Sequence, residues 1–285
     1  MTFSKFEALD DDGYKTQDIG AWGEVKYRVV SHYAALFSQS MKDKWDFLIY
    51  LDLFAGAGRS RIRENNKIIN SSSLSVLGLS QKFDQYIFND SDSINSDALK
   101  NRGDLYYPNS NISVLSEDVN ESILKIISKM PTPHSRNKIL SFCFLDPFKM
   151  DNLKFATIQK LSQRYMDFLV LIPTDMDAKR NLHNFLPLNN NTVESFIGNE
   201  QWREKWKDSN KKVTHFGEFI IDEFGQSMSN LGYITPKASE TYPIKNVKNR
   251  IIYRLSFYSK SKVGYKFWQE TKKYTNPQKE LFDLY

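Results

Sequence analysis

The feature of this sequence that most constrains its fold is a repeated alternation of short apolar runs with segments of helical spacing. The apolar runs are "FLIYLDLF", "QYIFND", "NISVLSED", "ILSFCFLDPF" and "MDFLVLIPT". Apolar runs of this length are typical of buried strands. Ahead of the first run, helical spacing places Trp22, Val25, Val29, Tyr33 and Leu36 on one face. Strands that alternate with helices form a parallel sheet covered on both faces, so the pattern predicts an α/β fold.

The alternation stops after residue 175, where a polar, Asn-rich and partly helical stretch begins. Beyond it, two strands joined around "KNVKNR" indicate an antiparallel hairpin. We therefore expect a Rossmann-like sheet of seven mostly parallel strands, with a C-terminal antiparallel hairpin and a helical insertion. The expected parts are an N-terminal helical segment (1–45), a ligand-binding core (46–175), the helical insertion (176–232), and C-terminal strands with a helix that complete the core (233–285).

Composition narrows the class of protein. The chain has 285 residues, of which 40% are hydrophobic and 26% charged, as is ordinary for a soluble globular protein. No apolar run approaches the roughly 20 residues that cross a bilayer, and the polar, acidic N-terminus does not read as a signal peptide. A single cysteine, Cys143, excludes an internal disulfide and is expected to be a buried thiol. We expect a cytoplasmic protein with no membrane partner.

Polar residues follow four of the predicted strands at the point where each strand ends. These are Asp52-Leu-Phe-Ala-Gly-Ala-Gly58, Asn89-Asp90, Glu117-Asp118 and Asp146-Pro147-Phe148. Because an open parallel sheet binds ligands at the carboxyl ends of its strands, these residues are expected to meet at one edge. Each signal alone is common in turns, and the alternative is an ordinary turn at Gly56–Gly58 with solvated Asp90 and Asp118.

The chemistry of these residues favours a nucleoside cofactor. Glycine lets a ligand approach the backbone closely, and acids at the second and third strand ends can accept hydrogen bonds from ribose hydroxyls and an adenine amino group. A dinucleotide would favour glycines that lead straight into a helix N-terminus, whereas here a basic loop, "RSRIRENNKIIN", intervenes. S-adenosylmethionine (SAM), which has no phosphate, fits better. The predicted cofactor-binding residues are Asp52, Phe54, Ala55, Gly56, Gly58, Asp90, Asp118 and Val119.

The motifs also resemble a known family. "DLFAGAG" resembles the first motif of class I SAM-dependent methyltransferases, and "DPF" resembles the Asp-Pro-Pro-Phe/Tyr motif of amino-methyltransferases with one proline missing. The whole chain, from Trp22 to Trp268, is similar to the three-Cys-motif partner protein family (TcmP). The matching pieces are "WGEVK", "YLDLFAGAGRS", "YIFNDSD", "SEDVN", "FCFLDPF", "MDFLVLIP" and "RIIYRLSFYSKSKVGYKFW". The chain departs from the family at "NSSSLS", where a glycine-containing helix start is usual. The resemblance implies a methyltransferase-like fold and a partner protein with a three-cysteine motif.

Asp146, Pro147 and Phe148 are the predicted catalytic residues. A carboxylate and a proline carbonyl could each accept a hydrogen bond from an aromatic amine, and a neighbouring ring could stack on the base. The alternative is a strand-ending Asp-Pro turn. Arg59 and Lys149 are predicted to bind substrate, whereas Arg59, Arg61 and Arg63 could equally form a solvated loop.

Residues 241–275 combine nine basic residues and one acid, Glu270, with many aromatic residues. This composition suits phosphate contact and base stacking, or else an aromatic core face with a solvated lysine face. Trp202 and Trp206 are expected to pack on one helix face, and the scattered histidines predict no metal site. The leading hypothesis is a SAM-dependent methyltransferase acting on an exocyclic amino group of a nucleic-acid base, DNA or RNA. The alternative is a SAM-binding or non-catalytic partner subunit of a three-cysteine-motif protein.

Overall fold

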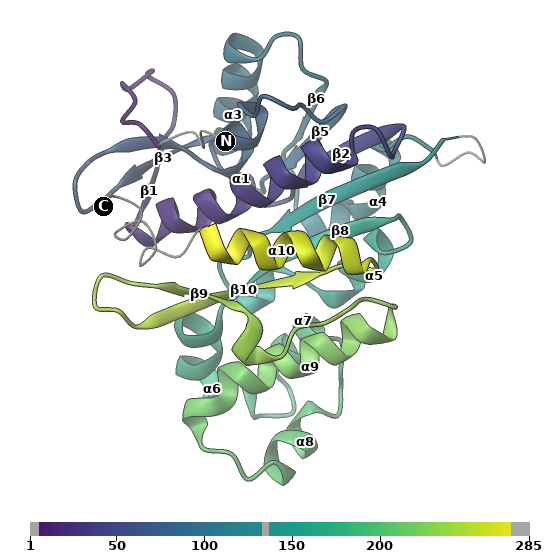
Figure 1. Cartoon of the computed structure of the whole chain (residues 1–285). Coiled ribbons are helices and arrows are strands. Elements are labelled where there is room, and N and C mark those ends of the chain that lie inside the picture. The colour runs from purple at the N-terminus through teal and green to yellow at the C-terminus, as the bar shows by residue number, and fades with distance from the viewer. Residues whose placement is uncertain (1–5, 133–136, 275–285) are drawn as a thin grey trace, which may run out of the picture.

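A computed structural model describes residues 6–132 and 137–274 of the chain (Figure 1). Its centre is a seven-stranded sheet in the order β6-β5-β2-β7-β8-β10-β9. The strands are β2 (Phe47–Asp52), β5 (Gln85–Asn89), β6 (Ile112–Leu115), β7 (Ile139–Leu145), β8 (Met166–Ile172), β9 (Tyr242–Lys245) and β10 (Ile251–Tyr258). β10 runs antiparallel to both of its neighbours, and the other pairings are parallel. This strand order is that of the class I methyltransferase fold, and the predicted fold class is confirmed.

Helices cover both faces of the sheet because successive strand residues point to opposite sides. Leu48 and Tyr50 pack on one side with α1 (Trp22–Met41), α2 (Ser72–Leu77), α3 (Ser93–Tyr106) and α10 (Lys262–Tyr274). Ile49 and Leu51 pack on the other side with α4 (Val119–Lys129) and α5 (Phe155–Leu161). Figure 1 shows α10 lying alongside α1 in front of the sheet. Cys143 is buried in β7 as a free thiol, as predicted.

The insertion after β8 extends the second of these layers. It contains the π-helix η2 (Thr174–Ala178), α6 (Lys179–Phe185), α7 (Thr192–Ile197), α8 (Trp202–Asp208) and α9 (Phe216–Asn230). Trp202 and Trp206 are both buried against Phe216, with ring centroids 5.8 and 4.9 Å away. The prediction that these two tryptophans are packing residues is therefore confirmed.

A second, small sheet lies beside the first and was not predicted. It pairs β1 (Gln17–Ile19) with β3 (Arg59–Ile62), which in turn pairs with β4 (Ile68–Asn70). The segment interpreted from sequence as a basic loop is therefore a hairpin, and the loop interpretation is wrong. The pairing with β1 is the physical reason, because backbone partners from far along the chain turn a polar stretch into a strand. We call residues 10–19, which contact Arg102 of α3 and end in β1, the N-terminal strap.

Candidate functional site

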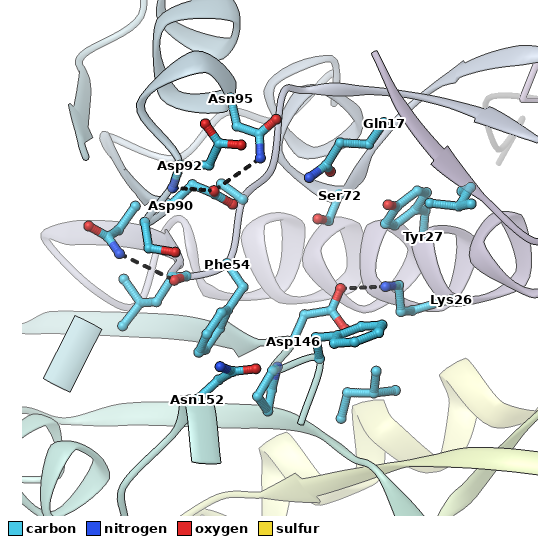
Figure 2. Close-up of a pocket in the computed structure, with 18 of the residues that line it drawn as sticks. Gln17, Lys26, Tyr27, Phe54, Ser72, Asp90, Asp92, Asn95, Asp146 and Asn152 are labelled. Carbon is cyan, nitrogen blue, oxygen red and sulfur yellow. Dashed lines mark hydrogen bonds and ion pairs between the residues drawn. The ribbon is translucent and has the colours of Figure 1, made fainter. Parts of the chain in front are cut away.

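A cavity of about 790 Å³ opens at the carboxyl ends of β2, β5, β6 and β7. Its size lies within the range of small-molecule sites in proteins. Figure 2 shows that residues from the N-terminal strap, α1 and the ends of β2, β5 and β7 face one another across it. The residues after the parallel strands meet here because the register places their ends level; Asp52, for example, lies opposite Phe88 and Phe144.

The structure brings eight of the predicted site residues to this cavity. They are Phe54, Ala55, Asp90, Asp118, Val119, Asp146, Pro147 and Phe148. The other five, Asp52, Gly56, Gly58, Arg59 and Lys149, are not part of the lining. Gly56 and Gly58 have positive φ angles in the loop that follows β2. Asp52 is buried and contacts the cavity through the lining residue Ser72.

The glycine loop is fixed by the acid at the end of β5. Gly56 has a φ of +62°, and its backbone N–H donates to Asp90 Oδ2 at 2.9 Å. A Cβ at Gly56 would lie 2.3 Å from Oε1 of Gln17, so the end of that side chain would have to move. The other oxygen of Asp90 accepts from Asp92 N and Asn95 Nδ2 at 3.0 and 3.1 Å. Asp90 therefore holds the loop, the β5 end and α3 together (Figure 2).

Asp118 is the N-cap of α4, at the end of the third predicted strand. Its Oδ1 accepts hydrogen bonds from the backbone N–H groups of Asn120 and Glu121 at 2.8 and 3.3 Å. Both bonds use the same oxygen, and the side chain is exposed on the cavity wall. Val119, the first residue of α4, is buried beside it.

Asp52 is fully buried beneath the cavity. Its Oδ2 accepts from the hydroxyl of Ser72, a lining residue, at 2.6 Å. Its Oδ1 is buried and makes no hydrogen bond with any described residue. Burial raises the pKa of Asp52 to about 7, and the nearby Asp146 carboxylate adds to this shift. The Ser72 hydroxyl, the backbone N–H of Phe54 and the charge of Lys26 oppose it. Burial thus destabilises the charged form of Asp52, and a positive charge nearby would stabilise it.

Asp146 forms an ion pair with Lys26 of α1, and both line the cavity (Figure 2). Lys26 is only 4% exposed, and the rings of Trp22 and Tyr27 lie 5.3 and 5.0 Å from its Nζ. Burial alone would lower the pKa of Lys26, but the Asp146 carboxylate raises it above its ordinary value. Burial raises the pKa of Asp146, and Lys26 opposes this shift. The pair therefore presents donors and an acceptor side by side.

Aromatic rings surround this pair. Phe148 is 65% exposed at the rim, although large aromatic side chains are usually covered. Trp22 and Tyr253 lie on the cavity wall with ring centroids 5.3 Å apart. A flat acceptor could enter between the rim and the wall.

Several lining residues were missed by sequence reasoning, among them Gln17, Lys26, Tyr27, Ser72 and Asn152. For Lys26 a signal was present, because it lies four residues after Trp22 and seven before Tyr33, on the apolar face of α1. A charge on an apolar helix face indicates a buried partner. For Gln17 there was no such signal, because its place depends on the pairing of β1 with β3.

The predicted substrate-binding residues lie outside the cavity lining. Arg59 is 8% exposed and pairs with Asp12 of the strap at 3.0 Å. Arg61 pairs with Asp11, whereas Arg63 does line the cavity. Lys149 is exposed just beyond Phe148. The basic, aromatic C-terminal segment mostly follows the structural alternative, since Tyr242, Tyr253, Phe257, Tyr258 and Trp268 are buried.

The cavity carries an excess of acid. Its carboxylates are Asp18, Asp90, Asp92, Glu117, Asp118 and Asp146, and its basic side chains are Lys15, Lys26 and Arg63. This charge favours a cationic ligand over one with a pyrophosphate. No group of three or more His, Cys, Asp or Glu side chains suited to a metal ion is found in the described parts of the chain. Nor does any helix there have the length and apolar character to span a membrane.

No protein-family model matches the chain, and no curated protein matches it significantly. Solved structures do resemble it. The Legionella pneumophila protein LPL1258 is 12% identical, with a TM-score of 0.48 and coverage of 86% of this chain and 88% of that one. Magnesium protoporphyrin IX methyltransferase (ChlM) from Synechocystis, with bound SAH, is 10% identical, with a TM-score of 0.44 and 84% of each chain covered. An O-methyltransferase from Bacillus cereus in complex with SAH is 11% identical, with a TM-score of 0.45 and coverage of 86% and 84%.

Proposed function

We propose that this chain is a SAM-dependent methyltransferase that acts on an exocyclic amino group of a nucleic-acid base. One observation carries the proposal: a single cavity joins the cofactor-type acids Asp90 and Asp118 to the acceptor-type motif at Asp146. This cavity lies at the edge of the sheet where open α/β folds bind their ligands.

The residues present fit SAM. When bound, SAM supplies a methyl group on a positively charged sulfur. Asp90 would accept from the ribose hydroxyls and Asp118 from the adenine amino group, while Phe54, Ala55 and Val119 would pack against the adenosyl group. The unpartnered Oδ1 of Asp52 and the acidic lining suit the positive charge of the cofactor. Gly56 and Gly58 would act indirectly, by letting the loop take positive φ angles.

Asp146, Pro147 and Phe148 would position the acceptor amine. The Asp146 carboxylate and the Pro147 carbonyl would accept hydrogen bonds from the amine, so that its lone pair faces the methyl group. With SAM bound, the amine nitrogen would form the new N–C bond as the C–S bond breaks, and the electron pair of the broken bond would stay on sulfur. The amine then releases one proton, to the Asp146 carboxylate or to water at the mouth of the cavity. Phe148, exposed at the rim, would stack on the base.

A nucleic acid is the proposed substrate, with a cytoplasmic site of action. Arg63, Lys149 and the turn between β9 and β10, which carries Lys248 and Arg250, would contact phosphates. Arg59 would act through the strap it holds. We also propose membership of the three-Cys-motif partner protein family, with a three-cysteine protein as partner, on the strength of the ordered motifs from Trp22 to Trp268.

Isothermal calorimetry tests the cofactor. Wild-type protein is expected to release or absorb heat with SAM and with SAH, and Asp90→Ala to lose this binding because the glycine loop loses its anchor. Asp97→Ala, an exposed position on α3, is the matched control. Wild-type protein that gives no signal with either ligand rules out the cofactor assignment.

Methyl transfer tests the reaction. Labelled SAM is incubated with single-stranded DNA and RNA, and Asp146→Ala is expected to lose transfer while it still binds SAM. A labelled product whose methyl group is not on an exocyclic amine contradicts the proposal.

The second candidate is a SAM-binding subunit without transfer activity of its own. The observation that favours it is the ion pair between Lys26 and Asp146, which gives this carboxylate a partner from the chain itself in place of a methyl acceptor. SAM binding without transfer to any nucleic acid, together with a stable complex with a three-cysteine protein, would select this candidate.

A further inference from the structure

Lys26 is an unusual residue for the wall of a cavity. Its side chain is 95% buried, yet it lines the cavity beside the proposed acceptor residues. It belongs to α1, far from the strand-end motifs in sequence, and it reaches them because α1 crosses the face of the sheet above β7. Lysine is almost never buried without a partner, and here the partner is Asp146.

The hydrogen bonds of this pair leave capacity for a ligand. A lysine ammonium has three donors, and a carboxylate can accept at both oxygens. Among the described residues, Nζ of Lys26 donates to Oδ2 of Asp146 and makes no other hydrogen bond. Oδ1 of Asp146 accepts none from them. The cavity wall therefore offers one unused acceptor and unused donors on neighbouring atoms.

The charge of the pair restricts what can bind. Asp146 keeps Lys26 protonated, because its carboxylate raises the pKa of the ammonium. The pair is neutral as a whole, so a neutral acceptor can bind without leaving a buried charge unpaired. The rings of Trp22 and Tyr27 beside Nζ make the surroundings suited to a flat, aromatic ligand.

We propose that the Lys26–Asp146 pair recognises the amidine unit of an amino-substituted base, in which one carbon carries both the amino group and a ring nitrogen. Asp146 accepts from the amino group, and Lys26 donates to the ring nitrogen. Adenine, cytosine and guanine contain this unit, whereas uracil, thymine and aliphatic amines do not. The inference rests on the proposed function and adds a second contact with the acceptor, from Lys26 to the ring nitrogen. Lys26 is a binding and orienting residue in this scheme, and it takes no proton.

Base analogues test the inference on the wild-type protein. Single-stranded oligonucleotides carry adenine, cytosine or guanine as their sole amino base, and each is compared with its analogue that lacks the ring nitrogen: 1-deazaadenine, 3-deazacytosine or 3-deazaguanine. For the base that is methylated, the analogue is expected to lower kcat/KM by roughly 10- to 100-fold, the effect of removing a hydrogen bond from a charged donor. The loss should lie mainly in KM, because the bond is made in the bound substrate before transfer. For adenine, 7-deazaadenine keeps the ring nitrogen of the unit and should react like the parent.

A variant completes the test. Lys26→Met has a similar length without donors, and it should methylate the parent and the deaza analogue with similar kcat/KM values. Should this variant not fold, the analogue series on the wild-type protein decides alone. A deaza analogue with the KM of its parent overturns the inference but leaves amino methylation standing. If SAM binds and no oligonucleotide is methylated, the proposed function itself fails and the inference fails with it.

Discussion

Asp52 is a carboxylate that the fold has removed from water without pairing it with a positive side chain. It accepts from Ser72, and its second oxygen has no partner among the described residues. Burial raises its pKa to about 7, so near neutral pH it is divided between the charged and neutral forms. A bound cation would favour the charged form. Under the proposed function, binding of SAM would therefore be coupled to loss of a proton from this residue.

This coupling predicts a pH dependence of SAM affinity. Below about pH 7 Asp52 is mostly protonated, and binding must release the proton; above it the cost is absent. Affinity should rise severalfold from pH 6 to pH 8, and calorimetry in buffers of different ionisation enthalpy should detect proton release at pH 6.5. Asp52→Asn, which stays neutral, should remove this release. An equal release in the variant would assign the proton to another group.

The N-terminal strap is the element on which the shape of the cavity depends. Its last residues, Gln17, Asp18 and Ile19, form both β1 and part of the cavity wall. Arg102 of α3 holds the strap in place and is fully buried. It donates to Asp12 at 2.8 and 2.6 Å, to the carbonyl of Lys15 at 2.7 Å, and to the carbonyl of Ala57 in the glycine loop at 2.6 Å. One side chain therefore joins the strap to the loop.

Arg102→Met is expected to release the strap without unfolding the sheet. Removing one partner of a buried charge network costs about 3–5 kcal/mol, and the cost should fall mainly on the strap because most of the lost bonds lie there. Hydrogen exchange in residues 10–19 should quicken, and SAM affinity should fall at least tenfold. Lys100→Met, at an exposed position of the same helix, is the control. Unchanged exchange in the strap would show that other contacts hold it.

The elements differ in how far the sequence predicts them. The strands that carry the acids were predictable, because apolar runs and strand-ending Asp and Gly residues are local signals, and the acids meet because parallel strands share an edge. The strap and β3 were not predictable, since their residues are mostly polar and pair with each other across some 40 residues, as between Gln17 and Ser60. The position of Lys26 on the apolar face of α1 indicated a buried partner but not which one, because Asp146 lies 120 residues away in sequence.

At the scale of the whole molecule, buried acids make stability depend on pH. Asp167 of β8 lies in the core and accepts from the hydroxyl of Tyr33 at 2.8 Å. Burial raises its pKa to about 6, with hydrogen bonds from Ser259 and Tyr33 opposing the shift. The folded state therefore binds a proton more tightly than the unfolded state. Proton binding by Asp167 therefore stabilises the folded state most below about pH 4, and this stabilisation is lost as the pH rises to about 6.

Asp167→Asn should remove this part of the pH dependence. The difference in free energy of unfolding, variant minus wild type, should increase by about 2–3 kcal/mol as the pH rises from 4 to 7. Urea unfolding across this range measures the difference, with Asp43→Asn at an exposed position as the control. A constant difference between variant and wild type would contradict the expected titration.

The overall charge arrangement predicts how nucleic acid binding responds to salt. Lys248 and Arg250 are exposed in the turn between β9 and β10, and Asn246 of the same turn lines the cavity. If both basic residues contact phosphates of a single strand, replacing each with Gln should reduce the slope of log K against log salt by about 0.7. Lys42→Gln is the control: it lies at the other end of α1, about 24 Å along the helix from Lys26. A slope that stays the same would exclude this turn from the interface.

The position of β10 in the sheet affects how the chain can be made. β10 lies between β8 and β9, although it is the last strand among the described residues. Until residue 258 has left the ribosome, β8 has an open edge, and the apolar Phe168, Leu169 and Val170 have no strand beside them on that side. Open strand edges of this kind pair with other chains. A chain cut before β10 should therefore be much less soluble than the full chain, because the edge of β8 stays open for pairing with other molecules.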